Sequence, residues 1–384
     1  MKQAQLSSLD ESTSLRSVAE QFDFEGAVLD VQRYGSGNVN DTFLVTLASD
    51  PREKAILQKV NQQVFRHPEL IILNMRAFIG HIWANNGRCG DTRERRWEIP
   101  AIIIAKNGAD YWRDSETGFW RMTTFVKGAQ TYDTIRDRRH SGEVGYALGR
   151  FHSLISDLPV ENLYDTLEGF HITPRYLAHY DAVTATGVGE HARSKSSPEV
   201  DYARNFVAQR RAWASVLEDA VRRGELALRP IHGDPKVNNI LIDDVTGQAV
   251  SVIDLDTVKP GLVHYDIGDC LRSCCNPLGE ETETLDAIRF EPDLCQAILK
   301  GYLGEARHFL TAKDYDYIYD AVRLIAFELG LRFFTDYLEG NVYFRTKDTE
   351  HNLRRALVQF RLTESIEAQA DAIRAIAASQ RSNL

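Results

Sequence analysis

The hydrophobic periodicity of this 384-residue chain changes once, near residue 128, and that change limits the possible folds more than any other feature. Before it, short alternating apolar runs between turn residues predict strands. After it, apolar residues recur at spacings of three and four, which is typical of amphipathic helices. We therefore expect an α+β chain with a β-rich N-terminal lobe (1–128), a linker near 126–131, and a mainly helical C-terminal lobe (129–384).

The N-terminal lobe is predicted to be a five-stranded, mostly antiparallel sheet with one long helix between its third and fourth strands. A short capped helix is expected at 13–22, and Pro68 at a first helical turn opens the long helix. The expected strands comprise two that flank a glycine-rich turn within 27–47, followed by 54–61, 98–105 and 120–128.

The C-terminal lobe is predicted to be helical at 141–158 and 202–224 and from about residue 262 onward. Helical character breaks at 230–261, where the sequence indicates loop, strand, a tight turn at Thr246-Gly247, strand and loop.

The interruption contains the residues best suited to chemistry, in the run HGDPKVNN from His232 to Asn239. Phosphoryl transfer requires a carboxylate near the attacking hydroxyl and oxygen ligands for Mg²⁺. Asp234 and Asn239 are five residues apart, the spacing of a kinase catalytic aspartate and its metal-binding asparagine. Asp254 follows a strand–turn–strand, which would return it beside Asn239. The alternative is an ordinary Gly/Asp/Asn-rich turn with Asp254 as a capping group.

A glycine-rich turn and a basic strand residue are candidates for ATP binding. Gly35, Ser36 and Gly37 would let the backbone approach phosphate oxygens, although such a turn between strands is usually only a hairpin. On the third strand Lys59 is the candidate cation, but Gln58 could occupy the inward register instead. Glu69 is the acidic residue available on the following helix to pair with Lys59.

These motifs resemble the aminoglycoside phosphotransferase superfamily, and within it most closely the bacterial N-acetylhexosamine 1-kinases. The blocks YGSGNVNDTFLV, HGDPKVNNILID, VIDLDTVKPG and GLRFFTDYLEGNVYF carry the resemblance, which covers about residues 25–370. It implies a two-lobed protein-kinase-like fold and transfer of the γ-phosphoryl group of ATP, with Mg²⁺, to the anomeric hydroxyl of N-acetylglucosamine or N-acetylgalactosamine.

The resemblance also implies roles for individual residues. Asp234 matches the catalytic base, and Asn239 and Asp254 match the Mg²⁺ ligands. Arg332 and Tyr343 match sugar-contacting positions. A guanidinium can hold two sugar oxygens, and a phenol ring can cover an apolar sugar face.

Other positions depart from the family pattern or have a role that the resemblance leaves open. Asn38 stands where a hexosamine kinase has histidine, and Asn40 replaces the third glycine of the kinase loop. We predict that both residues contact the substrate. Asp266 and Asp269 resemble an aspartate that braces the catalytic loop. His171 lies in a matching block, but a lone histidine between apolar and turn residues is more often structural.

Composition excludes several other classes of protein. A formal net charge of −10 argues against nucleic-acid binding, and the chain contains no run of 18 apolar residues and no signal-peptide pattern. We therefore expect a cytoplasmic enzyme without membrane partners. The five cysteines have no CxxC zinc spacing and are expected to be buried and reduced.

Three alternatives to a sugar 1-kinase remain at this point. The acceptor could be an aminoglycoside, an amino alcohol or another metabolite, and a cationic acceptor would need carboxylates such as the run Glu280, Glu281, Glu283 and Asp286. An inactive nucleotide-binding scaffold is disfavoured because Asp234, Asn239 and Asp254 are all present. A protein kinase is disfavoured because only ten residues separate Asp254 from Tyr265-Asp266, which leaves little room for a peptide platform.

Overall fold

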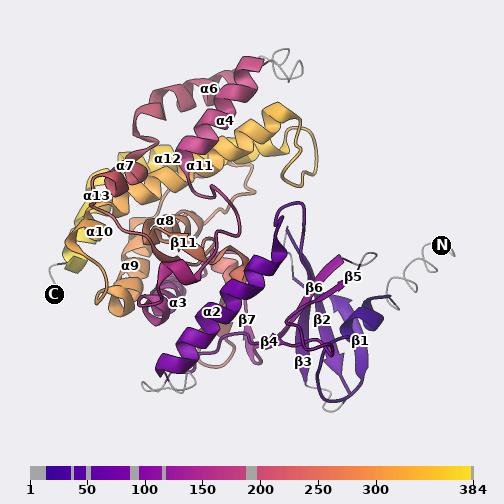
Figure 1. Ribbon diagram of the computed structural model, residues 1–384. Helices are drawn as coiled ribbons and strands as arrows, with labels where there is room; N and C mark the ends of the chain where they lie inside the picture. The colour runs from indigo at the N-terminus through magenta and orange to yellow at the C-terminus, as the bar shows by residue number, and fades with distance from the viewer. Residues whose placement is uncertain are drawn as a thin grey trace. The chain divides into compact units, whose positions relative to one another are not determined.

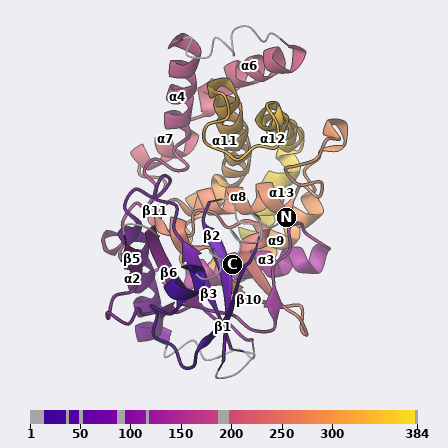
Figure 2. The same ribbon diagram turned by 90° about the vertical axis from the view of Figure 1, so that its right-hand side faces the viewer.

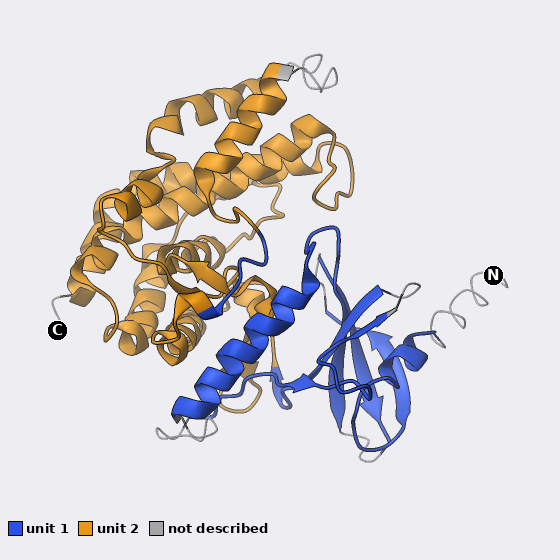
Figure 3. Cartoon of the chain, viewed as in Figure 1, with its two compact units in different colours: residues 1–129, 162–167 blue, residues 130–161, 168–384 orange. Residues whose placement is uncertain are grey.

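A computed structural model of the chain describes residues 14–35, 39–48, 53–86, 95–114, 118–186 and 197–381 (Figure 1). The chain divides into two compact units, the first comprising 1–129 and 162–167 and the second 130–161 and 168–384 (Figure 3). A sheet dominates the first unit and helices dominate the second, so the predicted α+β class with a kinase-like division of structure is confirmed.

The first unit contains a six-stranded antiparallel sheet in the order β1-β2-β3-β6-β4, with β5 paired to β6. Figure 2 shows β1, β2, β3 and β6 side by side. The long helix α2 (Pro68–Asn86) lies between β3 and β4 in sequence. The strands are β1 (Val28–Arg33), β2 (Asp41–Leu47), β3 (Lys54–Lys59), β4 (Ile102–Ile103), β5 (Trp112–Asp114) and β6 (Gly118–Thr124).

Two predictions for this sheet were wrong. The run 98–105 forms only the two-residue strand β4, because Pro100 has no N–H to donate to a ladder and residues 95–101 are irregular. The sheet has six strands rather than five because the short strand β5 also pairs antiparallel with β6.

The core of the first unit lies on one face of the sheet. Inward residues of β2, β3 and β6 alternate with a period of two, as a half-buried antiparallel sheet requires. They pack against the short helix at 14–19 and the segment that follows it. The short segment 162–167 also belongs to this unit, since the buried Asn74 on α2 exchanges two hydrogen bonds of 2.8 Å with the backbone of Tyr164.

The second unit is a set of helices with short strands between them. The helices are α3 (Arg138–Ile155), α4 (Thr173–Thr186), α6 (Pro198–Arg210), α7 (Val216–Arg222), α8 (Val263–Cys274), α9 (Pro292–Ala306), α10 (Ala312–Asp316), α11 (Ile318–Glu339), α12 (His351–Ala368) and α13 (Ala370–Arg381). The strands are β7 (Ala129–Gln130), β8 (Arg229–Ile231), β9 (Ile240–Asp243), β10 (Ala249–Val252) and β11 (Lys259–Gly261), in the groupings β10-β9-β7 and β11-β8.

Helix α11 is the centre of the second unit. It is buried nearly all round, which its almost continuous apolar sequence favours. It runs beside α12 in both ribbon views, and a cluster of stacked rings that includes Phe206, Phe327 and Phe360 joins it to α6 and α12 (Figures 1 and 2). The polar residues that α11 carries in this apolar setting are therefore candidates for function.

The predicted helix at 202–224 was wrong as a single element. Helix α6 ends at Arg210, a 3₁₀ turn follows at Arg211–Trp213, and α7 begins at Val216. The predicted helix at 141–158 begins earlier, at Arg138, because the Asp137 side chain caps it by accepting the His140 N–H at 2.8 Å. Within the described ranges, each helix falls short of the length and apolar character needed to cross a bilayer.

Candidate active site

The strand–turn–strand after the HGDPKVNN run returns as predicted. Strands β9 and β10 pair antiparallel around a turn in which Gly247 has φ 68°, a conformation that favours glycine. At the far end, the Ile253 N–H donates to the carbonyl of Asn239 at 2.9 Å. Asp254 is the next residue, so the ribbon brings it close to Asn239.

Asp266 holds the start of the catalytic loop, which we define as residues 232–239. This fully buried carboxylate on α8 accepts the backbone N–H of His232 at 2.7 Å and of Gly233 at 2.8 Å. Its Oδ2 also lies 2.8 Å from His152 Nε2 on α3. The predicted bracing role is therefore confirmed for Asp266. Asp269 accepts instead from the Arg272 guanidinium.

The backbone conformation and the packing at Gly233 exclude a larger residue. Its φ is 89°, and a Cβ there would lie 2.6 Å from the carbonyl oxygen of Thr257. The Thr257 hydroxyl also donates to the His232 carbonyl at 2.8 Å. The backbone before Asp234 is thus packed directly against the turn that follows Asp254.

Asp234 lies at the centre of a small group of polar side chains. Its carboxylate is 27 % exposed and accepts from Lys236 Nζ at 2.7 Å. Asn239 Nδ2 donates to the Asp234 carbonyl at 2.7 Å. Burial lowers the pKa of Lys236, but the charges of Asp234 and Asp254 outweigh it, so the pKa is raised and the ammonium stays charged.

Asn239 and Asp254 fit a hard divalent cation by the chemistry of their donors. The Asn239 amide N–H is used inside the loop, and its Oδ1 is the acceptor atom that could serve as a metal ligand. Asp254 is exposed and adopts a left-handed backbone conformation with φ 64°. Amide and carboxylate oxygens are the ligands that Mg²⁺ prefers. Among the described residues no group of three His, Cys, Asp or Glu forms a metal cluster.

Arg332, on the buried helix α11, is enclosed by aromatic rings. Its guanidinium carbon lies 5.0 Å from the ring centres of Phe170 and Tyr176 and 5.4 Å from that of Phe344. Within the described part of the chain no carboxylate or carbonyl accepts a hydrogen bond from it. Burial lowers its pKa, but Tyr176, Tyr343 and the charges of Glu328 and Asp234 raise it overall, so the cation is retained.

Tyr343 is 54 % exposed and lies on the loop after α11, which we call the acceptor loop (residues 341–350). The buried Asp336 holds this loop by accepting three successive backbone N–H groups, those of Val342 at 2.9 Å, Tyr343 at 2.7 Å and Phe344 at 3.0 Å. A carboxylate that accepts several N–H groups fixes a loop strongly. The loop that carries Tyr343 is therefore well defined at its N-terminal end.

Glu281 holds the other end of the acceptor loop. Its carboxylate accepts from Lys347 Nζ at 2.9 Å, His351 Nε2 at 2.8 Å and Arg355 Nε at 2.6 Å. Partial burial raises the pKa of Glu281, but these three hydrogen bonds and the charge of Arg355 outweigh it and lower the pKa to about 2. The predicted acidic run is thus largely neutralised, since Glu280 also pairs with Arg272.

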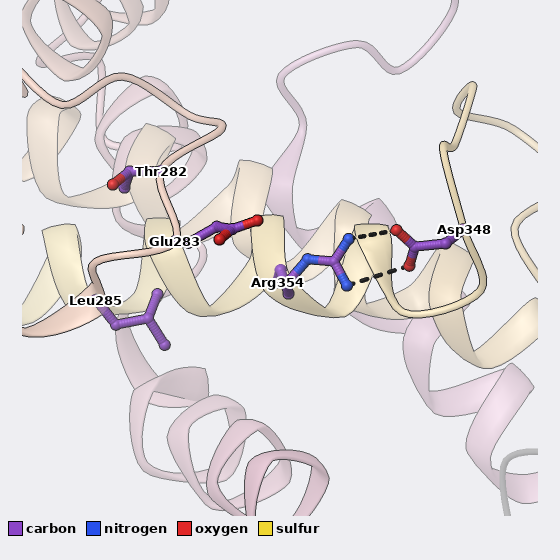
Figure 4. Close-up of a pocket in the computed structure, with 5 residues that line it drawn as sticks. All are labelled: Thr282, Glu283, Leu285, Asp348 and Arg354. Carbon is purple, nitrogen blue, oxygen red and sulfur yellow. Dashed lines mark hydrogen bonds and ion pairs between the residues drawn. The ribbon is translucent and has the colours of Figure 1, made fainter.

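A polar pocket contains one further side chain of the acidic run, Glu283. It is lined by Thr282, Glu283, Leu285, Asp348 and Arg354 (Figure 4). Figure 4 shows Arg354 directed at Asp348, and two hydrogen bonds of 3.1 and 2.6 Å join them. A cationic acceptor would meet a guanidinium here as well as carboxylates, so the pocket offers no site built for an amine.

The glycine turn of the first unit is only partly described. Gly35 has φ 76° and an open surrounding, whereas Ser36, Gly37 and Asn38 lie outside the described residues. The buried Asn40 accepts the Asn61 N–H on its Oδ1 at 2.9 Å. This bond ties the turn to the end of β3. The predicted phosphate and substrate contacts of these residues stay predictions.

Gln58 and Lys59 point to opposite faces of the sheet. Lys59 Nζ lies 5.6 Å from the ring centre of Trp120, on the face that carries the core. Gln58 is on the face of α2, where its Oε1 accepts from Arg121 Nε at 3.0 Å. Glu69 pairs with Arg113 rather than with Lys59. The buried cation on the α2 face is therefore Arg121, and the role of Lys59 stays a prediction.

Sequence reasoning missed several of these residues. Lys236 lies inside the HGDPKVNN run, and its place two residues after Asp234 is a signal that sequence reasoning passed over. The sequence does not single out Arg121 or Asp336, and it offers Glu281 only as one carboxylate of an acidic run, because the role of each depends on partners that the fold brings to it. The described cysteines, Cys270, Cys274, Cys275 and Cys295, are free and buried as predicted.

Comparisons with known proteins agree with this geometry. A family model described as the phosphotransferase enzyme family matches residues 30–305. The fold is similar to that of an aminoglycoside phosphotransferase from Alicyclobacillus acidocaldarius, at 15% identity, with 96% of this chain and 95% of that chain covered and a TM-score of 0.59.

Two further solved structures are similar at the same level. The amicoumacin kinase hAmiN, solved with AMP-PNP, Ca²⁺ and Ami, has 15% identity, 96% coverage of each chain and a TM-score of 0.58. A choline kinase from Cryptosporidium parvum has 13% identity, 94% and 96% coverage and a TM-score of 0.57. At these identities the likeness shows a shared fold.

Proposed function

Because the chain belongs to the phosphotransferase enzyme family, we propose that it is an ATP-dependent kinase that phosphorylates the anomeric hydroxyl of an N-acetylhexosamine. The products are ADP and the sugar 1-phosphate. The observation that carries the proposal is the braced catalytic loop, in which Asp266 holds the backbone and leaves the carboxylate of Asp234 partly exposed beside Lys236.

In this mechanism Asp234 orients the acceptor hydroxyl by accepting its hydrogen bond. The hydroxyl oxygen attacks the γ-phosphorus, the bond from that phosphorus to the bridging oxygen of ADP breaks, and the hydroxyl proton passes late to Asp234. Lys236 is positioned to offset the negative charge around Asp234. Because catalysis of this reaction rests on positioning and charge stabilisation, the rigidity of the loop is central to it.

ATP and a divalent cation are the proposed cosubstrate and cofactor. Asn239 and Asp254 would hold Mg²⁺, which when bound supplies positive charge to the phosphate oxygens. The similar amicoumacin kinase was solved with a nucleotide analogue and Ca²⁺. In the first unit, Gly35, Ser36, Gly37 and Lys59 are the residues proposed to contact the phosphates. We propose that the enzyme works in the cytoplasm.

Arg332 supports an acceptor that is neutral and rich in oxygen. The retained positive charge of Arg332 disfavours the ammonium groups of an aminoglycoside or amino alcohol, and its N–H groups, which no described carboxylate or carbonyl accepts, suit hydroxyl and carbonyl oxygens. The aromatic rings around it and Tyr343 suit the apolar face of a sugar. Arg332 and Tyr343, with Asn38 and Asn40 from the first unit, are therefore proposed to contact the sugar.

A coupled ADP-release assay with Mg²⁺-ATP tests the proposal against N-acetylglucosamine, N-acetylgalactosamine, glucose, galactose, glucosamine, kanamycin and choline. We expect turnover on an N-acetylhexosamine, with phosphate on C1 by phosphorus NMR. Turnover on kanamycin or choline alone would overturn the sugar assignment while leaving the kinase activity. Asp234→Asn is the chemical control and should lower kcat by about 10³-fold or more.

Arg332 variants test the acceptor argument directly. Arg332→Lys keeps the charge but loses the planar fork, so we expect the acceptor KM to rise about 10-fold with the KM for ATP unchanged. Arg332→Met should raise the acceptor KM further. An equal rise in both KM values would contradict a specific acceptor contact.

A further inference from the structure

His171 is buried beneath the catalytic loop and contacts it directly. It precedes α4, is 3 % exposed and adopts a left-handed backbone conformation with φ 66°. Its Nε2 lies 2.7 Å from the Gly233 carbonyl oxygen, and its Nδ1 lies 3.0 Å from Glu328 Oε1 on α11. A strained conformation at a buried polar residue often accompanies function.

Both partners of this imidazole are hydrogen-bond acceptors. A carbonyl oxygen cannot donate, and the second carboxylate oxygen of Glu328 already accepts from the Thr173 hydroxyl at 2.7 Å. A neutral imidazole has one N–H and can satisfy only one of the two contacts, whereas an imidazolium donates to both. The geometry therefore matches a doubly protonated His171.

The charged groups around His171 favour that state. Burial lowers its pKa, but the hydrogen bond and charge of Glu328, the charge of Asp269 and the Gly233 carbonyl outweigh burial and raise the pKa overall. The Tyr265 ring stacks on the imidazole at 5.6 Å between centres, and its hydroxyl is directed to Glu218. The carboxylates of Glu328 and Asp269 act on the imidazole, while the ammonium of the buried Lys259 donates to the carbonyl of the neighbouring Phe170 at 3.3 Å.

We propose that His171 is a positioning residue of the catalytic loop, whose imidazolium fixes the Gly233 carbonyl and so orients the next residue, Asp234, toward the acceptor hydroxyl. Asp266 holds the Gly233 N–H, so the two peptide planes on either side of the Gly233 Cα are held independently. The inference rests on the proposed role of Asp234, and it extends that role to a residue from a separate part of the chain.

Two other buried histidines provide an internal contrast. His232 Nδ1 accepts the Asp234 N–H at 3.2 Å while its Nε2 faces the Ile253 carbonyl, so one donor and one acceptor describe a neutral ring. His264 has one carbonyl partner, that of Asp314 at 2.9 Å, and its Nδ1 has no partner among the described residues. Burial lowers the pKa of both residues. Of these three histidines, only His171 has two acceptors.

The first test reads the charge of His171 without any activity. Protein labelled with ¹⁵N-histidine is followed by NMR from pH 6 to 9, with His171→Gln and His264→Gln used to assign the two rings. We expect the His171 signals to keep the imidazolium pattern at pH 7.5, where His264 shows a neutral ring. A neutral His171 at pH 6.5 would overturn the inference, whatever the enzyme phosphorylates.

The second test separates positioning from mere packing. His171→Leu removes both donors, and we expect kcat to fall about 100-fold with both KM values within about twofold. His171→Gln keeps a neutral donor that can reach the Gly233 carbonyl. Its kcat should therefore be about 10-fold higher than that of His171→Leu. His264→Gln, equally buried, should leave kcat within about twofold. If the panel above yields no acceptor, the slow hydrolysis of Mg²⁺-ATP replaces it as the rate measured.

The outcomes separate this inference from the proposed function. A folded His171→Leu protein with wild-type kcat, beside an inactive Asp234→Asn protein, overturns the positioning role alone. Full activity of Asp234→Asn overturns the proposed function, while the NMR experiment still decides the charge of His171. If His171→Leu does not fold, the kcat of His171→Gln decides: no change relative to wild type overturns the inference, and a fall of about 10-fold at constant KM supports it.

Discussion

The catalytic loop and the acceptor loop belong to the same unit but are held in different ways. The catalytic loop is fixed by groups with almost no exposure, Asp266 and His171. The acceptor loop is fixed by one buried carboxylate, Asp336, and by Glu281, which is 44 % exposed on its side chain. Buried charge-assisted hydrogen bonds are much stronger than exposed ion pairs. The difference predicts that changes to the supports of the catalytic loop cost most, that changes at Asp336 cost less, and that changes at the exposed Glu281 cost least.

The largest effect is expected from breaking the brace of the catalytic loop. Asp266→Asn preserves shape but points an amide N–H₂ at groups that are themselves donors, so we expect a loss of about 3–5 kcal/mol in the free energy of unfolding. Turnover should be lost with it. Urea unfolding followed by circular dichroism measures the free energy of unfolding, and the ADP-release assay measures turnover.

The exposed Asp286→Asn is the matched control for that experiment. It makes the same chemical change on the surface and should alter the free energy of unfolding by no more than about 0.5 kcal/mol. Equal effects of the two variants would show that the buried contacts of Asp266 with the catalytic loop are not the cause of the loss.

A smaller and more selective effect is expected from Asp336→Asn. Asp336 accepts three backbone N–H groups of the acceptor loop, so this variant should lose about 2–3 kcal/mol and release the segment that carries Tyr343. We expect the acceptor KM to rise at least about 10-fold while the KM for ATP stays the same. Steady-state kinetics with each substrate varied in turn measures both KM values. A fall in kcat at constant acceptor KM would contradict a role of this loop in binding the acceptor.

The pH dependence of stability provides a third comparison. The pKa of His171 is raised in the folded protein, so its stabilisation is fully present below its unfolded value of about 6.5 and is lost as the pH rises through the folded pKa. The gap in unfolding free energy between wild type and His171→Gln should therefore narrow above pH 6.5, by roughly 1.4 kcal/mol for each unit by which the pKa is raised. Urea titrations at several pH values measure the gap, and a gap that widens with pH would contradict a charged His171.

The smallest effect is expected at Glu281. Because this carboxylate is partly exposed, Glu281→Gln should cost less than about 1 kcal/mol and raise the acceptor KM only a few-fold. Its pKa is about 2 in the folded protein, so its stabilisation is present above pH 4.5 and is lost as the pH falls from 4.5 toward 2. Wild type and Glu281→Gln should therefore converge in stability in acid, and a constant difference down to pH 3 would speak against the ion-pair cluster.

Local patterns predicted much of the fold and part of the site. The periodicity change near residue 128 predicted the division into sheet and helices, and the turn at Gly247 predicted the return of the chain to Asn239. Predictions were poorer where a local pattern competes with backbone chemistry. The run 98–105 is apolar enough for a strand, but Pro100 cannot donate to a ladder.

The residues that support the site could not be predicted in the same way. Glu328 lies 157 positions from His171, and Asp336 gains its role only because the chain turns back over the end of α11. The local sequence GFHITPR does not distinguish a structural histidine from a functional one. Its role depends on which acceptors the fold brings to its two nitrogens.

The sequence by itself determined the class of fold and the run of residues suited to phosphoryl transfer, because both are expressed in local spacing along the chain. Tertiary structure alone decided that Lys236 contacts Asp234, that aromatic rings surround Arg332, and that two acceptors face the nitrogens of His171. The physical reason is that hydrogen bonds and charges act over a few ångströms of space. Their partners come from helices that are far apart in sequence and meet only when the core around α11 is packed.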